Sequence, residues 1–215
     1  MSMTANTLFE AASDERSRAQ LLATSSKESG AWLHAVPLSS LGLRMDNNTV
    51  RVAVCPGLGA AICHPHTCCN CGAEVDHLAT HGLSCRKSEG RHFRHAALND
   101  ILHQALSSVN VSSCLEPAAI SHSDWKRPDG ISLLPRERGR LLVWDATCSD
   151  TYAPSYITSA ASEAGAVASQ AEERKIMKHD HLHASLLFIL VAVETAGVFG
   201  RLTRAFFKKL AWSLH

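Results

Sequence analysis

The chain has 215 residues, of which 46% are hydrophobic and 19% charged, and this composition excludes disorder throughout. Its 21 basic and 20 acidic side chains give a net charge of +1, which excludes a uniformly basic surface but allows a local basic face. No secretory leader opens the sequence, and the longest apolar run, residues 186–193, is far shorter than the roughly 20 residues that span a bilayer. We therefore expect a protein that is not secreted, has no membrane partner and resides in the nucleus or the cytoplasm.

The N-terminal part of the sequence contains few strong signals for regular structure. Residues 1–30 predict a polar lead-in that is partly disordered or helical, with one helix around residues 8–22. Residues 31–62 predict a linker segment, in which the alternation of Val50, Val52 and Val54 and the glycines that follow indicate short elements and turns. Residues 63–90 contain most of the cysteines and predict a small metal-folded module.

The remainder of the sequence predicts a mixed sheet flanked by helices. Apolar residues at helical spacing predict a helix over residues 93–106. Apolar runs at residues 131–134 and 141–144, separated by a polar loop with proline and glycine, predict a hairpin. Residues 160–179 predict a helix, residues 186–193 a third strand and residues 206–214 a terminal helix. The expected class is α/β, in its α+β mixed-sheet form, with a core over residues 91–200 and a C-terminal helix or tail over 201–215.

The cysteines and histidines indicate a zinc site. Eight cysteines in a chain without a secretory leader predict reduced thiols or metal ligands rather than disulfides. Clustered cysteines, with a His and a Cys further on, can close a tetrahedral zinc site, whereas free thiols and surface imidazoles would not need such clustering. The spacing leaves the first ligand open, so the candidates are Cys68 or Cys69, with Cys71, His81 and Cys85. Four protein ligands leave no open position, so this Zn²⁺ would be structural.

Two aspartates lie at one end of the predicted hairpin. Antiparallel pairing across the loop places residue 134 opposite residue 140 and, by the same register, Asp129 opposite Asp145. Opposed carboxylates repel each other unless a cation lies between them, and Mg²⁺ prefers such oxygen ligands. Each aspartate alone could instead cap a strand end, but their opposition favours a cation site.

A lysine pair lies on the helix predicted over residues 160–179. Lys175 and Lys178 are three residues apart and therefore share a helix face. Either ammonium group could stabilise the charge on a phosphate during metal-assisted hydrolysis, although a solvated helix face is the alternative. Glu194, at the end of the third strand, could orient this helix or a water, or serve as a surface residue.

Further basic residues follow the cysteine module and precede the hairpin. They could contact nucleic-acid phosphates or serve only solubility. The net charge of +1 argues against strong nonspecific binding. The candidates are Arg86, Lys87, Arg91, Arg94, Lys126 and Arg127.

The order of these motifs resembles the restriction-like endonuclease at the C-terminus of non-LTR retrotransposon reverse-transcriptase proteins. The resemblance covers residues 28–200, and its combination of motifs is more specific than any single one. The matching segments are Glu28-Ser29-Gly30-Ala31-Trp32-Leu33, Cys69-Asn70-Cys71-Gly72, His81-Gly82-Leu83-Ser84-Cys85, Gly90-Arg91-His92-Phe93-Arg94-His95, Leu98-Asn99-Asp100-Ile101, Lys126-Arg127-Pro128-Asp129-Gly130, Val143-Trp144-Asp145-Ala146-Thr147, Glu173-Arg174-Lys175, Lys178-His179 and Val191-Ala192-Val193-Glu194-Thr195.

This resemblance implies a restriction-endonuclease-like core of the PD-(D/E)xK type, preceded by a small zinc knuckle. Such a core nicks target DNA so that reverse transcription can start there. By resemblance, Asp129 and Asp145 would bind the catalytic Mg²⁺, with Lys175 as the first candidate for the catalytic lysine and Lys178 as the second. DNA would be the partner, element RNA a second candidate partner, and no small-molecule substrate is expected.

Two departures from the family pattern affect the prediction. A tyrosine often follows the second lysine in the family, and here His179 stands in that place. A reverse-transcriptase domain is missing from this sequence, so we expect a fragment, a domesticated copy or a decayed one. The alternative function is therefore a catalytically decayed, zinc-containing nucleic-acid-binding module. Retention of Asp129, Asp145 and Lys175 together favours the enzyme, because a binding module has no use for that combination.

Overall fold

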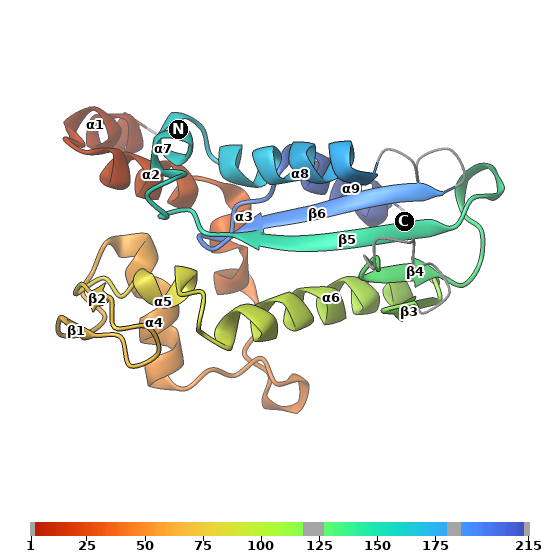
Figure 1. Cartoon of the computed structure of the whole chain (residues 1–215), viewed down its shortest axis with the longest axis horizontal. Helices are drawn as coiled ribbons and strands as arrows, with labels where there is room; N and C mark the ends of the chain where they lie inside the picture. The colour runs from red at the N-terminus through yellow and green to blue at the C-terminus, as the bar shows by residue number, and fades with distance from the viewer. Residues whose placement is uncertain (1–2, 118–126, 180–185, 213–215) are drawn as a thin grey trace. The chain divides into compact units, whose positions relative to one another are not determined.

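The computed structural model describes residues 3–117, 127–179 and 186–212 (Figure 1). The chain divides into two compact units whose segments alternate along the sequence. Unit 1 comprises Met1–Arg91, Asp150–Val167 and Glu194–Val198, and unit 2 comprises His92–Ser149, Ala168–Val193 and Phe199–His215. Within the described ranges, no helix is both long and apolar enough to cross a bilayer.

Unit 1 consists of short helices and one very small sheet. Its elements are α1 (Met3–Ala11), α2 (Glu15–Thr24), α3 (Lys27–Gly30), η1 (Ala31–His34), η2 (Ser39–Leu41), α4 (Asn47–Leu58), β1 (His66–Thr67), β2 (Glu74–Val75), α5 (His81–Ser84) and α7 (Ile157–Ser162). Helix α2 packs against α7, and buried Ala19 and Ala160 form a small core there together with Val167 of the first turn of α8 (Ala166–His179). Small side chains at this contact let the two helices approach closely. The predicted polar lead-in is therefore helical, and one of its helices contributes to a core.

Helix α4 replaces the short elements and turns predicted from the valine alternation. The Asp46 side chain accepts hydrogen bonds from the backbone N–H groups of Asn48 and Thr49 and so caps the start of the helix. Gly59, with a φ of 63°, closes its end in the left-handed conformation that glycine adopts readily. The alternation misled the prediction because Val50 and Val52 pack into no core and stay exposed, at 41% and 46%. The capping residues at the two ends define this helix instead.

Unit 2 is built on a four-stranded sheet, which has the mixed character that the sequence predicts. The strand order is β3 (Ser113–Leu115), β4 (Gly130–Ser132), β5 (Leu142–Ser149) and β6 (Leu187–Glu194). Strand β4 is antiparallel to both β3 and β5, whereas β5 and β6 run in the same direction (Figure 1). The strands predicted around residues 131–134, 141–144 and 186–193 are thus present, and β3 is an additional edge strand.

The β4–β5 hairpin has the register predicted from its loop. Gly130 lies opposite Trp144 and Ile131 opposite Val143, which is the register expected from the loop, and Asp129 and Asp145 are the residues that flank this pairing. Beyond the paired strands, the Asp129 N–H donates to the Trp144 carbonyl at 3.0 Å, and the Asp129 carbonyl accepts from the Glu116 N–H at 2.9 Å. These two bonds hold the backbone of Asp129 between its neighbouring chain segments.

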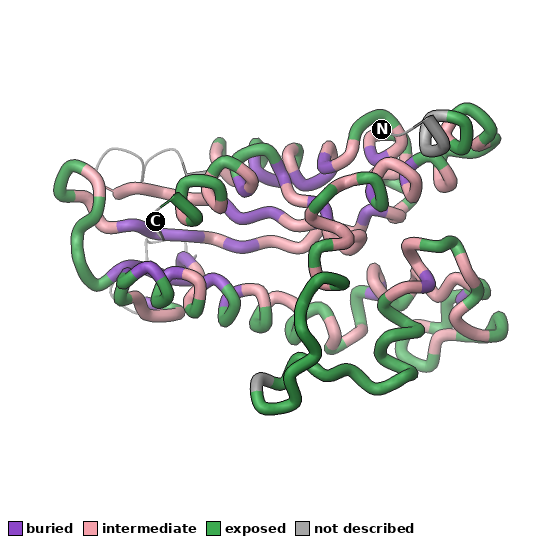
Figure 2. Tube along the Cα trace, turned by 180° about the vertical axis from the view of Figure 1, so that it is seen from behind, coloured by how far each residue is buried: buried purple, intermediate pink, exposed green. Residues whose placement is uncertain are grey.

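Helices cover both faces of this sheet. On one face, α6 (Gly90–Ser108) and α9 (Arg201–Trp212) enclose the main core, which includes Leu102, Leu106 and Trp144. The Trp144 indole is 1% exposed and donates a hydrogen bond to the Asn99 side-chain oxygen at 3.1 Å. On the other face, α8 (Ala166–His179) packs through alanines onto β6. Figure 2 shows the buried residues following the strands and the inner sides of these helices.

The helix predicted over residues 160–179 is two helices, α7 and α8. Gly165, with a φ of 87°, lies between them in a conformation that interrupts helical hydrogen bonding. Buried Glu194 accepts a hydrogen bond from the Val167 N–H at 3.1 Å and so caps the first turn of α8. The terminal helix α9 begins earlier than predicted, where the buried Glu172 carboxylate accepts from the N–H groups of Leu202 and Thr203.

Candidate zinc centre and catalytic cluster

A tight turn and a short helix bring four zinc-type ligands together in unit 1. Cys68 and Cys71 lie in the turn between β1 and β2, whereas His81 and Cys85 come from α5 and the residue that follows it. The Cys68 N–H donates to the Ala73 carbonyl, and the Gly72 N–H donates to the Cys68 carbonyl, each at 2.8 Å. These backbone hydrogen bonds close the turn that carries Cys68 and Cys71.

The geometry of the four ligand atoms fits a tetrahedral metal ion. The thiol sulfurs and the imidazole nitrogen all lie within 4.8 Å of one another. The Sγ atoms of Cys68 and Cys85 are 3.9 Å apart, close to the roughly 3.8 Å edge of a tetrahedron with zinc–sulfur bonds of about 2.3 Å. His81 Nε2 lies 3.1 Å from Cys71 Sγ. Three sulfurs and one imidazole are a common structural zinc set, so this cluster could hold Zn²⁺.

Of the two cysteines that the sequence left open, the structure brings Cys68 into the cluster. Cys68 belongs to the cluster, whereas Cys69 is exposed and its Sγ lies 3.8 Å from the Asn70 side-chain oxygen. Backbone N–H groups of Asn70 and Cys71 donate to the Cys68 sulfur and lower the pKa of this thiol to about 6. A lowered pKa favours the thiolate, which is the form that binds zinc. Cys69 therefore lies beside the site and not in it.

The two hairpin aspartates and Lys175 meet at one place in unit 2. Lys175 Nζ donates to Asp145 Oδ1 at 2.5 Å and to the Ala146 carbonyl at 3.1 Å. The Ala146 N–H donates to Asp129 Oδ2 at 2.6 Å. The cluster thus joins three segments that are distant in sequence: the start of β4, the middle of β5 and helix α8. Two carboxylates and one carbonyl oxygen converge there, with one ammonium group bound to them.

His95 of α6 belongs to the same cluster, although the sequence gave no reason to select it as a site residue. Its Nε2 lies 3.1 Å from Asp129 Oδ2, opposite the side on which Lys175 contacts Asp145. Asp129, His95 and Lys175 lie on different elements, so no regular spacing in the sequence connects them. His95 lies four residues before Asn99, so the helix places the two side chains on one face, where they are hydrogen-bonded to each other.

The pKa values of the two aspartates are shifted in opposite directions. Burial raises the pKa of Asp129, but hydrogen bonds from His95 and the Ala146 N–H outweigh it and hold this pKa below its usual range. Burial also raises the pKa of Asp145, and although Lys175 opposes this effect, repulsion by Asp129 adds to it and the pKa stays above its usual range. The hydrogen bond to Asp129 raises the pKa of His95. Neighbouring groups whose pKa values are shifted in opposite directions are typical of catalytic and cation-binding clusters.

The remaining predicted residues are distributed as follows. Lys178 lies in α8, but its side chain is outside the part of the chain that the structure describes, and Lys126 lies outside the described residues altogether. Arg94 is half-buried. The exposed basic residues are Arg86, Lys87, Arg91 and Arg127.

Comparison with known proteins adds no family assignment. No model of a known protein family matches the chain, and a search of curated proteins found no match.

Proposed function

We propose that this protein is a magnesium-dependent DNA endonuclease with a restriction-endonuclease-like core, derived from a non-LTR retrotransposon. The observation that carries the proposal is the convergence of Asp129, Asp145 and Lys175 at one end of the β4–β5 hairpin. The sequence motifs predict these three residues as a catalytic set, and in the fold they come from segments distant in sequence. A set chosen only by chance would have no reason to meet within hydrogen-bonding distance.

The oxygen atoms of this cluster fit a hard divalent cation. The carboxylates of Asp129 and Asp145 and the Ala146 carbonyl are the ligand types that Mg²⁺ prefers. The Lys175 ammonium already binds two of these oxygens, which indicates that positive charge is favoured at this position. Bound Mg²⁺ would supply polarisation of the scissile phosphate and a lowered pKa for the attacking water.

The side chains of the chain itself would supply positioning and charge. His95 and the Ala146 N–H both donate to Asp129 Oδ2 and so fix the orientation of that carboxylate. Lys175, held by the rigid helix α8, would donate to a phosphate oxygen as negative charge develops on it. A charged donor preorganised in this way is worth a factor of about 10²–10³ in rate.

The second candidate is a zinc-stabilised nucleic-acid-binding module without turnover. The Cys68, Cys71, His81 and Cys85 cluster and the exposed basic residues beside it serve either function. The half-buried carboxylates favour the enzyme, because partly desolvating two neighbouring acidic groups costs free energy, and two negative charges do not favour contact with a polyanion.

Nicking of supercoiled plasmid in Mg²⁺ buffer tests the proposal. Replacing Asp129 or Asp145 by Ala should abolish nicking, while DNA binding and the circular-dichroism spectrum stay near those of the wild type. The matched control is Asp100→Ala, which removes an exposed carboxylate from α6 and should leave the rate unchanged. Lys175→Ala should slow nicking by about 10²-fold or more, and more than Lys178→Ala does. Equal nicking by the Asp145 variant would refute the enzyme, and a wild type that binds DNA without cutting it would favour the binding module.

The basic residues around the zinc centre are proposed to contact DNA phosphates. Replacing Arg91 and Arg94 together by Ala should weaken binding and flatten its dependence on salt, because each lost phosphate contact releases fewer counterions. If the salt dependence of DNA binding is unchanged in this double variant, Arg91 and Arg94 do not contact phosphates and contribute only to solubility.

A further inference from the structure

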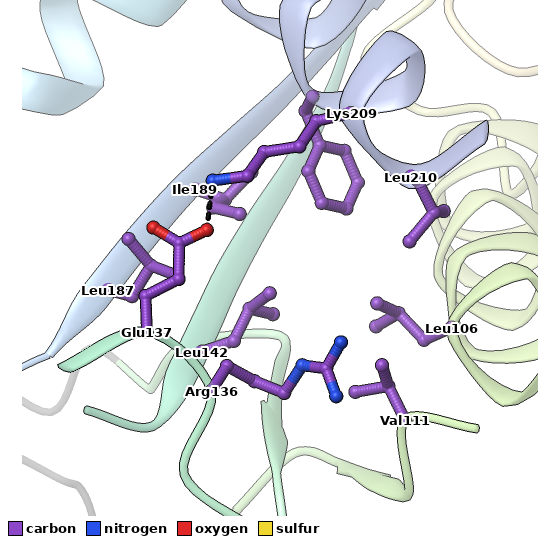
Figure 3. Close-up of a pocket in the computed structure, with 10 residues that line it drawn as sticks. Leu106, Val111, Arg136, Glu137, Leu142, Leu187, Ile189, Lys209 and Leu210 are labelled. Atoms are coloured by element: carbon purple, nitrogen blue, oxygen red, sulfur yellow. Dashed lines mark hydrogen bonds and ion pairs between the residues drawn. The ribbon is translucent and has the colours of Figure 1, made fainter. Parts of the chain in front are cut away.

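A cavity of about 400 Å³ lies within unit 2, away from the catalytic cluster (Figure 3). Its walls come from α6, β5, β6 and α9 and from the loop between β4 and β5. Most of the lining is aliphatic or aromatic, including Leu106, Leu142, Ile189 and Leu210. Small-molecule sites of this size are typically apolar with a few placed polar groups. The polar groups of this cavity therefore determine which ligand it would accept.

Three charged side chains line the cavity, and two of them neutralise each other. Glu137 and Lys209 form an ion pair at one side (Figure 3). The Arg136 guanidinium extends from the loop toward Leu106 and Val111 (Figure 3). Among the residues that the structure describes, this guanidinium makes no hydrogen bond or ion pair. The cavity thus combines an apolar interior with one uncompensated positive charge.

We propose that this cavity binds a small amphipathic monocarboxylate, such as a medium-chain fatty acid. The carboxylate would accept paired hydrogen bonds from Arg136, whose planar guanidinium matches a carboxylate in geometry. The alkyl chain would lie on the apolar walls and gain free energy from leaving water. A monoanion fits better than a dianion, because Glu137 leaves only one net positive charge at the cavity. This site is independent of the proposed nuclease, since it shares no residue with the catalytic cluster.

Isothermal titration of the full-length, zinc-loaded chain with decanoate, below its micelle-forming concentration, tests the site. We expect saturable binding of one decanoate per chain, and weaker binding of 1-decanol, which has the same chain without the charge. Arg136→Gln should weaken decanoate binding about tenfold, the equivalent of about 1.4 kcal/mol, and leave decanol binding unchanged. The matched control is Arg138→Gln, an exposed arginine of the same loop that does not line the cavity and whose loss should change neither affinity.

Several results would overturn this inference. These are the absence of saturable decanoate binding to the wild type, equal affinities for decanoate and decanol, or equal affinities in the two glutamine variants. Both substitutions replace exposed side chains, so both variants should fold, and circular dichroism checks this directly. The assay reads binding alone, so loss of nuclease activity would not affect its interpretation.

Discussion

Gly130 is the residue whose replacement should most clearly connect the fold to the catalytic cluster. It lies opposite Trp144 in the hairpin, and a Cβ atom at position 130 would overlap the indole ring. The indole has no room to move away, because it is 1% exposed and its nitrogen is bound to Asn99. Gly130→Ala must therefore shift the ring or separate the two strands, and it would displace the adjacent Asp129.

The expected cost is that of overpacking a well-filled core. Such substitutions cost about 1–3 kcal/mol, and the rigid surroundings of Trp144 place this one near about 3 kcal/mol. In a Trp144→Phe background the two indole atoms nearest the added Cβ, Cζ2 and Cη2, are gone. There, Gly130→Ala should cost less than about 1 kcal/mol, because alanine is otherwise better than glycine in a strand. The two substitutions should thus show a coupling free energy of about 2 kcal/mol.

Urea unfolding followed by far-UV circular dichroism measures these free energies. The control is Gly82→Ala, where an added Cβ meets no atom within 4 Å and where stability should be unchanged or slightly higher. A cost below about 0.5 kcal/mol for Gly130→Ala, or the same cost in both backgrounds, would refute the role of the Gly130–Trp144 contact.

Three further predictions concern the zinc centre, the catalytic cluster and the helix caps. Cys68→Ser should release zinc and unfold residues 63–90 locally, whereas Cys69→Ser should retain one zinc per chain by metal analysis; a protein that purifies without zinc and folds in chelator would contradict this. Asp129 raises the pKa of His95 above 6.5, so this ion pair should stabilise the fold at lower pH and be lost as the pH rises through the raised pKa; an NMR titration should show that Asp129→Asn lowers the His95 pKa. Glu172→Gln should cost about 1–3 kcal/mol in urea unfolding, because the amide cannot accept all the hydrogen bonds that the carboxylate receives from the start of α9, and an unchanged unfolding midpoint would argue against this cap.

Local patterns predicted the parts of the fold that depend on neighbouring residues. The hairpin register followed from the loop, and strand β6 from an uninterrupted apolar run. Helix α4 was not predicted, because the valine alternation indicates short extended elements, whereas the capping residue Asp46 determines where the helix begins. The division between α7 and α8 was missed because a single glycine within an alanine-rich stretch does not always end a helix, and here its positive φ does.

The cluster of Asp129, Asp145, Lys175 and His95 could be predicted only in part, for a physical reason. Asp129 and Asp145 flank the paired residues Gly130 and Trp144 of one hairpin, so their proximity follows from the hairpin register. Lys175 and His95 reach them from helices on the two sides of the sheet. Residue spacing holds no information on such tertiary contacts, and Lys175 was expected only through the family resemblance. The choice of Cys68 over Cys69 likewise depends on how the turn directs two adjacent side chains, which the turn hydrogen bonds determine.

A magnesium titration of plasmid nicking separates the enzyme from the binding module. The proposal predicts that zinc-loaded wild-type protein nicks plasmid at a rate that rises with Mg²⁺ concentration and then saturates. Asp145→Asn, which keeps the shape of the side chain but removes its charge, should show no nicking over the same range, with zinc content and DNA affinity unchanged. Nicking that does not depend on Mg²⁺, or equal nicking by the Asp145→Asn protein, would contradict the assignment of this cluster as the catalytic site.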